Sequence, residues 1–177
     1  MADIEIILLP YAVTEGNSLL HRLISELEKP EWTEIRFAVA FAEQSGNYYR
    51  LLQAMVGFSQ RGGKIHITFG ADAFRGEDRG SEYLAVETLL EALGELERVK
   101  ICLYHEKGRT FHPKLYLFSN EEAKAALVIV GSSNWSDGGF VQNVEANLVA
   151  HLDLTRCEEM ACYRQIVECF DLFWSQQ

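Results

Sequence analysis

The 177-residue chain lacks a low-complexity tract, a linker-like segment and an internal repeat. Nothing in the sequence therefore divides it, and we expect residues 1–177 to form a single domain. Hydrophobic residues make up 48% of the chain and charged residues 24%, proportions that are ordinary for a globular protein with a good core.

The chain also lacks a basic leader. Its opening segment, MADIEIILLPYAV, is apolar, but Asp3 and Glu5 interrupt it. This pattern favours a first β-strand over a signal peptide or a membrane span. We accordingly expect a cytoplasmic protein with no membrane partner.

Signatures of metal and nucleotide binding are missing as well. The four cysteines fit no metal-ligand spacing, and three of them fall in a helix-like C-terminal segment, where reduced, partly buried thiols are expected. The segment GSSNWSDGG has neither the lysine of a P-loop nor the G-x-S-x-G of a hydrolase, and its Asp-Gly-Gly end is typical of a turn. Other histidines near Glu106 and Asp153 match no ligand pattern, so we expect no metal and no cofactor. These cysteines and histidines are Cys102, Cys157, Cys162, Cys169, His66, His105 and His151.

Basic residues are scarce, with 16 Lys and Arg against 26 Asp and Glu and a net charge of −10. This balance argues against a nucleic-acid partner, because phosphate-backbone binding depends largely on Lys and Arg. The deficit is uneven, however: residues 61–114 hold nine basic and nine acidic side chains. Six cations of this stretch could line a groove to Lys114, although a solvated mixed-charge surface explains each of them equally well. They are Arg61, Lys64, Arg75, Arg79, Lys107 and Arg109.

Hydrophobic periodicity predicts an α/β protein, in which strands alternate with amphipathic helices. The last predicted helix repeats large apolar residues at helical spacing, which indicates a core or dimer contact rather than a ligand site. These residues are Met160, Tyr163, Val167, Phe170 and Trp174. The predicted strands span 4–9, 34–42, 64–70, 98–104, 114–119, 125–131 and 143–151, and the predicted helices span 16–29, 46–60, 81–96 and 154–175.

One sequence pattern indicates a specific kind of chemistry. In FHPKLYLF, His112 and Lys114 stand two residues apart, so on a strand both side chains project to the same face. Pro113 favours a position at the start of a strand, since proline cannot donate to a ladder and holds the preceding residue extended. The strand KLYLF, the turn NEE and the strand ALVIV then form a hairpin that returns Gly131 to the neighbourhood of His112.

The residues gathered by this hairpin suit attack on a phosphodiester. Gly131 permits close backbone approach, the hydroxyls of Ser132 and Ser133 and the amide of Asn134 are neutral donors, and Lys114 supplies positive charge. His112 is left as the nucleophile.

An imidazole attacks phosphorus only if an acceptor holds its other nitrogen. Glu145, eleven residues after Asn134, is the candidate acceptor.

The pattern His112-x-Lys114, Gly131-Ser132-x-Asn134 and Glu145 resembles the phospholipase D superfamily, especially its single-motif nuclease branch. The resemblance extends to FAVAFAEQSG and GGKIHITFGAD, which look like modules found alone or joined to restriction enzymes and helicases. It implies a mixed central β-sheet flanked by helices on both faces. The fullest family pattern has an aspartate where this chain has Ser119, which weakens a lipid-hydrolase function more than a nuclease function.

The family's active site uses two such motifs, one histidine attacking phosphorus and the other protonating the leaving oxygen. This chain has one motif and no repeat, so the resemblance implies a homodimer with paired His112 residues at the interface. The first hypothesis is a metal-independent phosphodiesterase, a DNA endonuclease that forms a phosphohistidine, with a possible companion restriction or helicase protein. The alternatives are a noncatalytic dimerising module that binds DNA or protein, and a phospholipid hydrolase or transferase.

Overall fold

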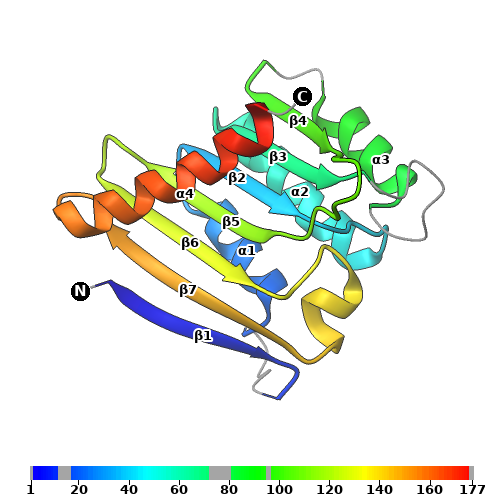
Figure 1. The fold of residues 1–177 in the computed structure, drawn as a ribbon, viewed down its shortest axis with the longest axis horizontal. Coiled ribbons are helices and arrows are strands. Elements are labelled where there is room, and N and C mark those ends of the chain that lie inside the picture. Colours follow the sequence, from blue (N-terminus) through cyan, green and yellow to red (C-terminus); the bar gives the residue numbers. More distant parts are fainter. Residues whose placement is uncertain (1, 12–16, 72–80, 95–96, 176–177) are drawn as a thin grey trace.

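The structure is a computed structural model that describes residues 2–11, 17–71, 81–94 and 97–175. One seven-stranded mixed sheet runs through it in the order β1-β7-β6-β5-β2-β3-β4 (Figure 1). Strands β2, β3 and β4 pair in parallel, and the remaining pairs are antiparallel. The strands are β1 (Asp3–Leu9), β2 (Glu34–Val39), β3 (Lys64–Gly70), β4 (Val99–Tyr104), β5 (Lys114–Asn120), β6 (Ala125–Gly131) and β7 (Glu145–Asp153).

Helices cover both faces of this sheet, which confirms the predicted α/β class (Figure 1). Helices α1 (Leu19–Glu28), α2 (Gly46–Gln60) and α3 (Tyr83–Leu93) pack on one face. Helix α4 (Cys157–Ser175) packs on the other. Ser18 and Ser45 cap α1 and α2 by accepting hydrogen bonds from His21 N and Tyr48 N.

The predicted elements are all present, with ends that differ by a few residues. The part of the helix prediction at residue 16 and the part at residues 95–96 lie outside the described residues. An element that the sequence did not predict is the π-helix η2 (Gly138–Gln142), where a turn was expected. It follows the Gly131–Asn134 loop directly and therefore contributes to the shape of that loop.

The core has two parts, one on each face of the sheet. The larger part joins α1, α2 and α3 to β2, β3 and β5 and includes Phe37, Phe69 and Trp135. The smaller part lies under α4, where Tyr163 and Phe170 are buried. Met160 and Val167 pack beside them, so the apolar side of the last helix is core, one of the two roles expected for it.

No disulfide joins the four cysteines, all of which are among the described residues, and their burial differs from expectation. Cys102 is buried, but Cys157, Cys162 and Cys169 are exposed on α4 rather than partly buried. None of the described helices combines the length and the apolar character that a membrane span requires.

Candidate active site

The five candidate residues lie at one edge of the sheet because of its strand order. Lys114 is the first residue of β5 and pairs with Val39 at the end of β2. Gly131 ends β6 and pairs with Asn147 on β7, the strand that begins at Glu145. The hairpin prediction is therefore right that the loop 131–134 returns to the start of β5.

His112 and Lys114 contact each other directly. The Nζ atom of Lys114 lies 2.8 Å from Nδ1 and 3.0 Å from Nε2 of His112, and it donates to the His112 carbonyl oxygen at 3.1 Å. His112 is exposed, whereas Lys114 is only 6% exposed. The pair therefore presents its imidazole to solvent and keeps its cation largely covered.

Electrostatics favour the neutral imidazole. Partial desolvation and then the charge of Lys114 lower the pKa of His112 below its ordinary value of 6.5. Burial lowers the pKa of Lys114 to about 8, while the charge of Glu145 opposes this change. Near neutral pH the site thus combines an unprotonated imidazole with a protonated lysine, a nucleophile beside a cation.

Phe41 supports both side chains, and the sequence did not identify it. Its ring lies edge to face with the His112 ring at a centroid distance of 5.7 Å, and Lys114 Nζ lies 5.8 Å from its centroid. Such contacts restrict the orientation of the imidazole and favour a cation over the ring. The available signal was the position of Phe41 two residues after the end of β2, inside the segment FAVAFAEQSG.

The segment that follows β2 also connects the His112 segment to the 131–134 loop. Ala40 N donates to Pro113 O at 3.0 Å, and Trp135 N donates to Phe41 O at 2.9 Å. Glu43 N then donates to Trp135 O at 2.9 Å. Backbone bonds thus fix the His112 segment and the 131–134 loop to the same short stretch of chain.

Gly131 allows the loop to lie against β7, a close approach to protein that the sequence did not predict. A Cβ atom at this position would collide with Asn147 Oδ1 and with the carbonyl oxygen of Ala146. Ser132 N donates to Ala146 O at 3.2 Å, and the Ser132 hydroxyl accepts from Ala146 N at 3.1 Å. Ser132 remains exposed, and its hydroxyl donates to Ala146 O at 3.5 Å, a long bond that a ligand oxygen could replace.

Ser133 differs from the prediction, because its side chain points into the protein. It is fully buried, and Asn147 Nδ2 donates to its hydroxyl at 2.8 Å. The Tyr116 hydroxyl donates to the Ser133 carbonyl at 3.0 Å. Ser133 therefore anchors the loop and is not a phosphate donor, while Asn147 and Tyr116 hold it from below. Asn147 was not foreseen, because a strand asparagine carries no signal of such a role.

Asn134 is partly buried beside the π-helix. Gly139 approaches the Asn134 backbone so closely that a Cβ atom there would collide with it. Asn134 Oδ1 is buried without a hydrogen-bond partner, whereas its amide nitrogen is a donor that a phosphate oxygen could use.

Glu145 lies at the site, but in a different relation from the one predicted. Asn143 Nδ2 donates to its Oε1 at 3.4 Å, and its charge acts on the pKa of Lys114 and raises that of Tyr116. Across residues 97–175, which hold both side chains, no hydrogen bond or ion pair joins Glu145 to His112. Within one chain, Glu145 therefore supports the lysine rather than the histidine.

The cationic groove of the sequence prediction does not form as expected. Lys64 opens β3 opposite Glu34, whereas Lys114 lies at the other end of β2, roughly 17 Å away at the usual strand rise. Arg61 donates to the Leu27 carbonyl. Arg75 and Arg79 lie outside the described residues.

Two predicted cations keep a position consistent with the groove. Lys107 and Arg109 lie in the β4–β5 loop, just before His112, and are exposed. Arg109 forms an ion pair with Glu106 at 2.9 Å.

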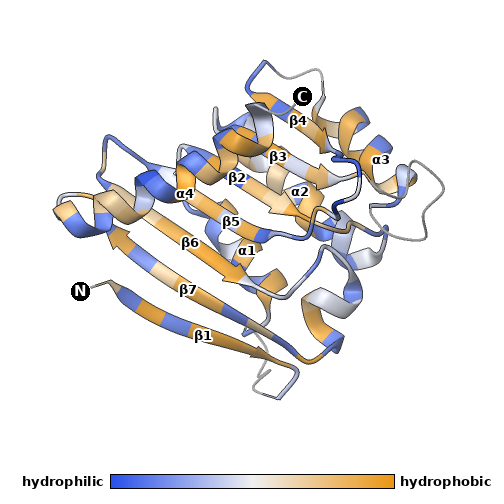
Figure 2. Cartoon of the chain, viewed as in Figure 1, coloured by the Kyte–Doolittle hydropathy of each residue, from blue (hydrophilic) through white to orange (hydrophobic). Residues whose placement is uncertain are grey.

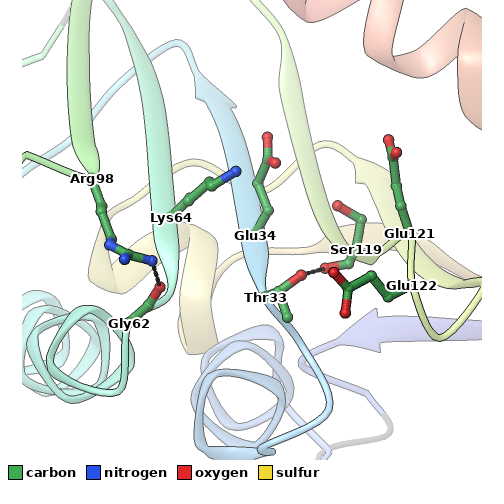
Figure 3. A pocket seen from close by; sticks show the side chains of 8 residues that line it. All are labelled: Thr33, Glu34, Gly62, Lys64, Arg98, Ser119, Glu121 and Glu122. Atoms are coloured by element: carbon green, nitrogen blue, oxygen red, sulfur yellow. Dashed lines mark hydrogen bonds between the residues drawn. The ribbon is translucent and has the colours of Figure 1, made fainter.

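A polar cavity of about 450 Å³ lies at the edge of the sheet opposite His112 (Figure 3). Lys64, Arg98, three carboxylates and Ser119, the residue at the family's aspartate position, line it. Arg98 donates to the Gly62 carbonyl at 2.9 Å. Thr33 Oγ1 donates to the Ser119 carbonyl at 3.3 Å. With no imidazole or thiol among its lining residues, this cavity has no nucleophile of the kind found at His112.

Comparisons with known proteins agree with this fold and motif. A sequence model of the family described as "Cardiolipin synthase, PLD-like domain" matches residues 23–170. The chain belongs to this family of phospholipase D-like domains, and the resemblance indicated by its motif is confirmed. No curated protein sequence matches the chain.

Solved structures show the same fold. The chain is similar to Nuc from Salmonella typhimurium, a phospholipase D family member, with a TM-score of 0.70 and 16% identity, over 99% of this chain and 96% of that one. It is similar to NucT from Helicobacter pylori with a TM-score of 0.61 and 19% identity, over 95% and 97% of the two chains. A polyphosphate kinase from Porphyromonas gingivalis matches with a TM-score of 0.57 and 17% identity, over 83% of this chain and 23% of that one.

Proposed function

We propose that the protein is a metal-independent phosphodiesterase that cleaves DNA through a covalent phosphohistidine at His112, as a homodimer. The observation that carries this proposal is the contact between the largely buried Lys114 ammonium and the exposed His112 imidazole at the sheet edge. A neutral nucleophile and a fixed cation, side by side, are what attack on an anionic phosphodiester requires.

In the first step a ring nitrogen of His112 attacks phosphorus, and the bond from phosphorus to the leaving oxygen breaks. Lys114, the Ser132 hydroxyl and the Asn134 amide donate to the non-bridging oxygens, where negative charge accumulates. His112 of a second copy protonates the leaving oxygen. Water then attacks the phosphohistidine, the second histidine takes its proton, and the phosphorus–nitrogen bond breaks.

Glu145 is proposed to orient His112 when substrate is bound. In the free chain Lys114 Nζ lies within 3.0 Å of both nitrogens of the imidazole. Phosphate would draw the ammonium away from the ring and free one nitrogen for a carboxylate. Hydrogen bonds at active sites often tighten only in the complex, so the free arrangement is compatible with this role.

DNA is preferred to lipid as substrate for two reasons. Lys107 and Arg109 are exposed in the β4–β5 loop a few residues before His112, from where they could contact a phosphate backbone. Ser119 also departs from the fullest family pattern at the aspartate position. The net charge of −10 nevertheless predicts weak binding that weakens further with salt.

The test is cleavage of labelled single-stranded and double-stranded DNA in EDTA, with release of headgroup from phospholipid vesicles measured in parallel. The protein is quenched in alkali during turnover, and an acid-labile phosphohistidine is sought by mass spectrometry. His112→Ala should abolish cleavage and labelling, whereas His151→Ala, a histidine that pairs with Glu5 away from the site, should preserve both. Headgroup release without DNA cleavage would identify a phospholipid as the substrate instead of DNA. DNA binding that His112→Ala leaves unchanged, without any turnover, would favour a noncatalytic module.

A further inference from the structure

A cavity of about 480 Å³ lies between α4 and the adjoining ends of β5 and β6. We call it the α4 cavity; residues 112–115 and 130–131 line its strand side. Its volume falls within the range of roughly 300–1,000 Å³ that is typical of sites for small ligands. The residues that α4 contributes recur at three- and four-residue spacing, which places their side chains on one face of the helix. They are Cys162, Gln165, Ile166 and Cys169.

The strand side of the α4 cavity is an open apolar surface. Leu115 of β5 pairs directly with Val130 of β6, so both side chains lie on the same face of the sheet. Further along these strands Leu117 pairs with Val128, and both are buried in the core beneath α4. Val130 is instead 48% exposed, and Figure 2 shows β6 as hydrophobic along its length. The core beneath α4 therefore stops before the ends of the two strands.

The α4 cavity adjoins the candidate active site. His112 and Lys114 are among its lining residues, and so is Gly131, which begins the 131–134 loop. A phosphate that Lys114 holds and His112 attacks would therefore lie beside the cavity. In DNA a single sugar separates a phosphate from a base, so the base of that nucleotide is close enough to enter.

We propose that the α4 cavity holds one nucleobase next to the scissile phosphate, outside any base stack. This inference rests on the proposed function and narrows its substrate to a strand with an unpaired base at the point of cleavage. The faces of an unstacked base are apolar surface in contact with water, and the cavity would cover them again. A base inside a duplex cannot enter, because its faces are stacked on its neighbours.

The polar groups of the lining favour a base over an acyl chain. Gln165 is exposed, and its amide carries two N–H donors and an acceptor, which match the donors and acceptors on the edge of a base. An acyl chain has no group that could use this amide. A base therefore uses both the apolar strand side and the polar helix side of the cavity.

The charge of the lining is also compatible with a nucleic-acid strand. The chain contains 26 Asp and Glu, yet none of the described residues that line the α4 cavity is acidic. Lys114 contributes a positive charge instead. A polyanionic strand is thus not repelled at this place, although the net charge of −10 repels it elsewhere.

The first test follows cleavage in EDTA of a labelled single-stranded oligothymidine in which one residue is abasic. One of the two phosphates beside the abasic residue should be cleaved about 10-fold more slowly than the other phosphates of the strand, because no base enters the cavity there. Cys162→Trp places an indole in the cavity, so this difference between phosphates should vanish. Cys157→Trp makes the same change at an exposed residue of α4 outside the cavity and should keep the difference.

The native cysteines give a second readout that needs no turnover. Cys162 and Cys169 are exposed and line the cavity, whereas Cys157 is exposed on the same helix outside it. Oligothymidine at roughly ten times its Kd for the His112→Ala protein should slow iodoacetamide alkylation of the two cavity cysteines about 10-fold by mass action. Alkylation of Cys157 should not change. A fully abasic strand at the same multiple of its own Kd should protect none of the three, as peptide mass spectrometry measures.

Circular dichroism melting monitors folding, and Cys169→Trp fills the cavity from another position on α4 if Cys162→Trp melts early. Cleavage without protection of the two cavity cysteines would overturn the base site and leave the proposed function intact. Protection without any cleavage would keep the base site and remove the proposed function. Equal protection by a fully paired duplex, or protection by a lysophospholipid and not by oligothymidine, would overturn the unstacked base as the occupant.

Discussion

The Nζ atom of Lys114 lies 2.8 Å from Nδ1 and 3.0 Å from Nε2 of His112, so it is within contact distance of both ring nitrogens. This position lets one cation act on whichever nitrogen is unprotonated. It also links the two titrations, because the charge of Lys114 contributes to the lowered pKa of His112. The pH behaviour of the protein therefore reports on this contact directly.

The activity should follow a bell-shaped pH profile. On bis(p-nitrophenyl) phosphate the stable p-nitrophenolate ion leaves without a proton, so the second histidine need not be protonated. His112 attacks only when neutral, and its pKa lies below 6.5, so kcat/KM for this substrate should rise with pH through that range. Lys114 stabilises charge only when protonated, and its pKa is about 8, so activity should decline as pH increases beyond 8. Initial rates on bis(p-nitrophenyl) phosphate between pH 4.5 and 10 measure both limbs. Lys114→Arg should remove the alkaline limb, because arginine stays protonated; an unchanged limb in that variant would assign it to another group.

Removal of the positive charge of Lys114 should lower kcat. Lys114→Met keeps the length of the side chain but takes away its charge and its donors, so kcat should fall by about 10²- to 10³-fold, the usual effect of losing one charge-stabilising group. The pKa of His112 should rise toward 6.5 in the same variant, which NMR titration of the imidazole measures. Lys100→Met changes an exposed lysine on β4 and serves as the control. A His112 pKa equal to the wild-type value would contradict the proposed coupling.

Stability should depend on pH through the same lysine. The folded-state pKa of Lys114 is about 8 against an ordinary 10.5, so from pH 8 to 10.5 the unfolded chain binds more protons than the folded one. The free energy of unfolding then gains a contribution as pH rises through this window, on the order of 3 kcal/mol at most. Urea titrations at pH 7 and pH 10 measure the difference between the wild-type protein and Lys114→Met. The variant should lack this gain, and equal pH dependence in the two proteins would refute it.

The sequence predicted the elements well because apolar periodicity reflects burial directly. The face of a helix was harder to assign. Leu84 is apolar and lies in α3, yet it is 54% exposed, because the buried residues Ala85, Leu89 and Leu93 follow a four-residue spacing that excludes it. In α4 the exposed Cys162 directly precedes the buried Tyr163, so a one-residue difference decides which side chain meets solvent.

The part of the site that is built from residues close together in the sequence could be predicted. His112, Lys114 and the 131–134 loop meet because a single hairpin joins them. Phe41 follows β2, a strand that pairs with β5 only in the folded sheet, and no local sequence pattern predicts that pairing. The prediction that Lys64 lines a groove to Lys114 was wrong for the same reason. Because β2 and β3 run in parallel, Lys64 at the start of β3 lies beside the start of β2, far from the site.

Ser133 and Asn134, neighbours in the loop, should respond differently to substitution. Ser133→Ala removes the hydrogen bond from Asn147 Nδ2 and leaves that buried amide unsatisfied, so the free energy of unfolding should fall by about 1–3 kcal/mol while kcat of the folded protein changes less than ~3-fold. Asn134→Ala removes a donor facing the substrate, so kcat should fall by about 10²-fold. Urea unfolding and initial rates on the same preparations measure both quantities. If Ser133→Ala lost as much turnover per folded molecule as Asn134→Ala, the hydroxyl of Ser133 would have to reach the phosphate, and its inward position in the free chain would not persist in the complex.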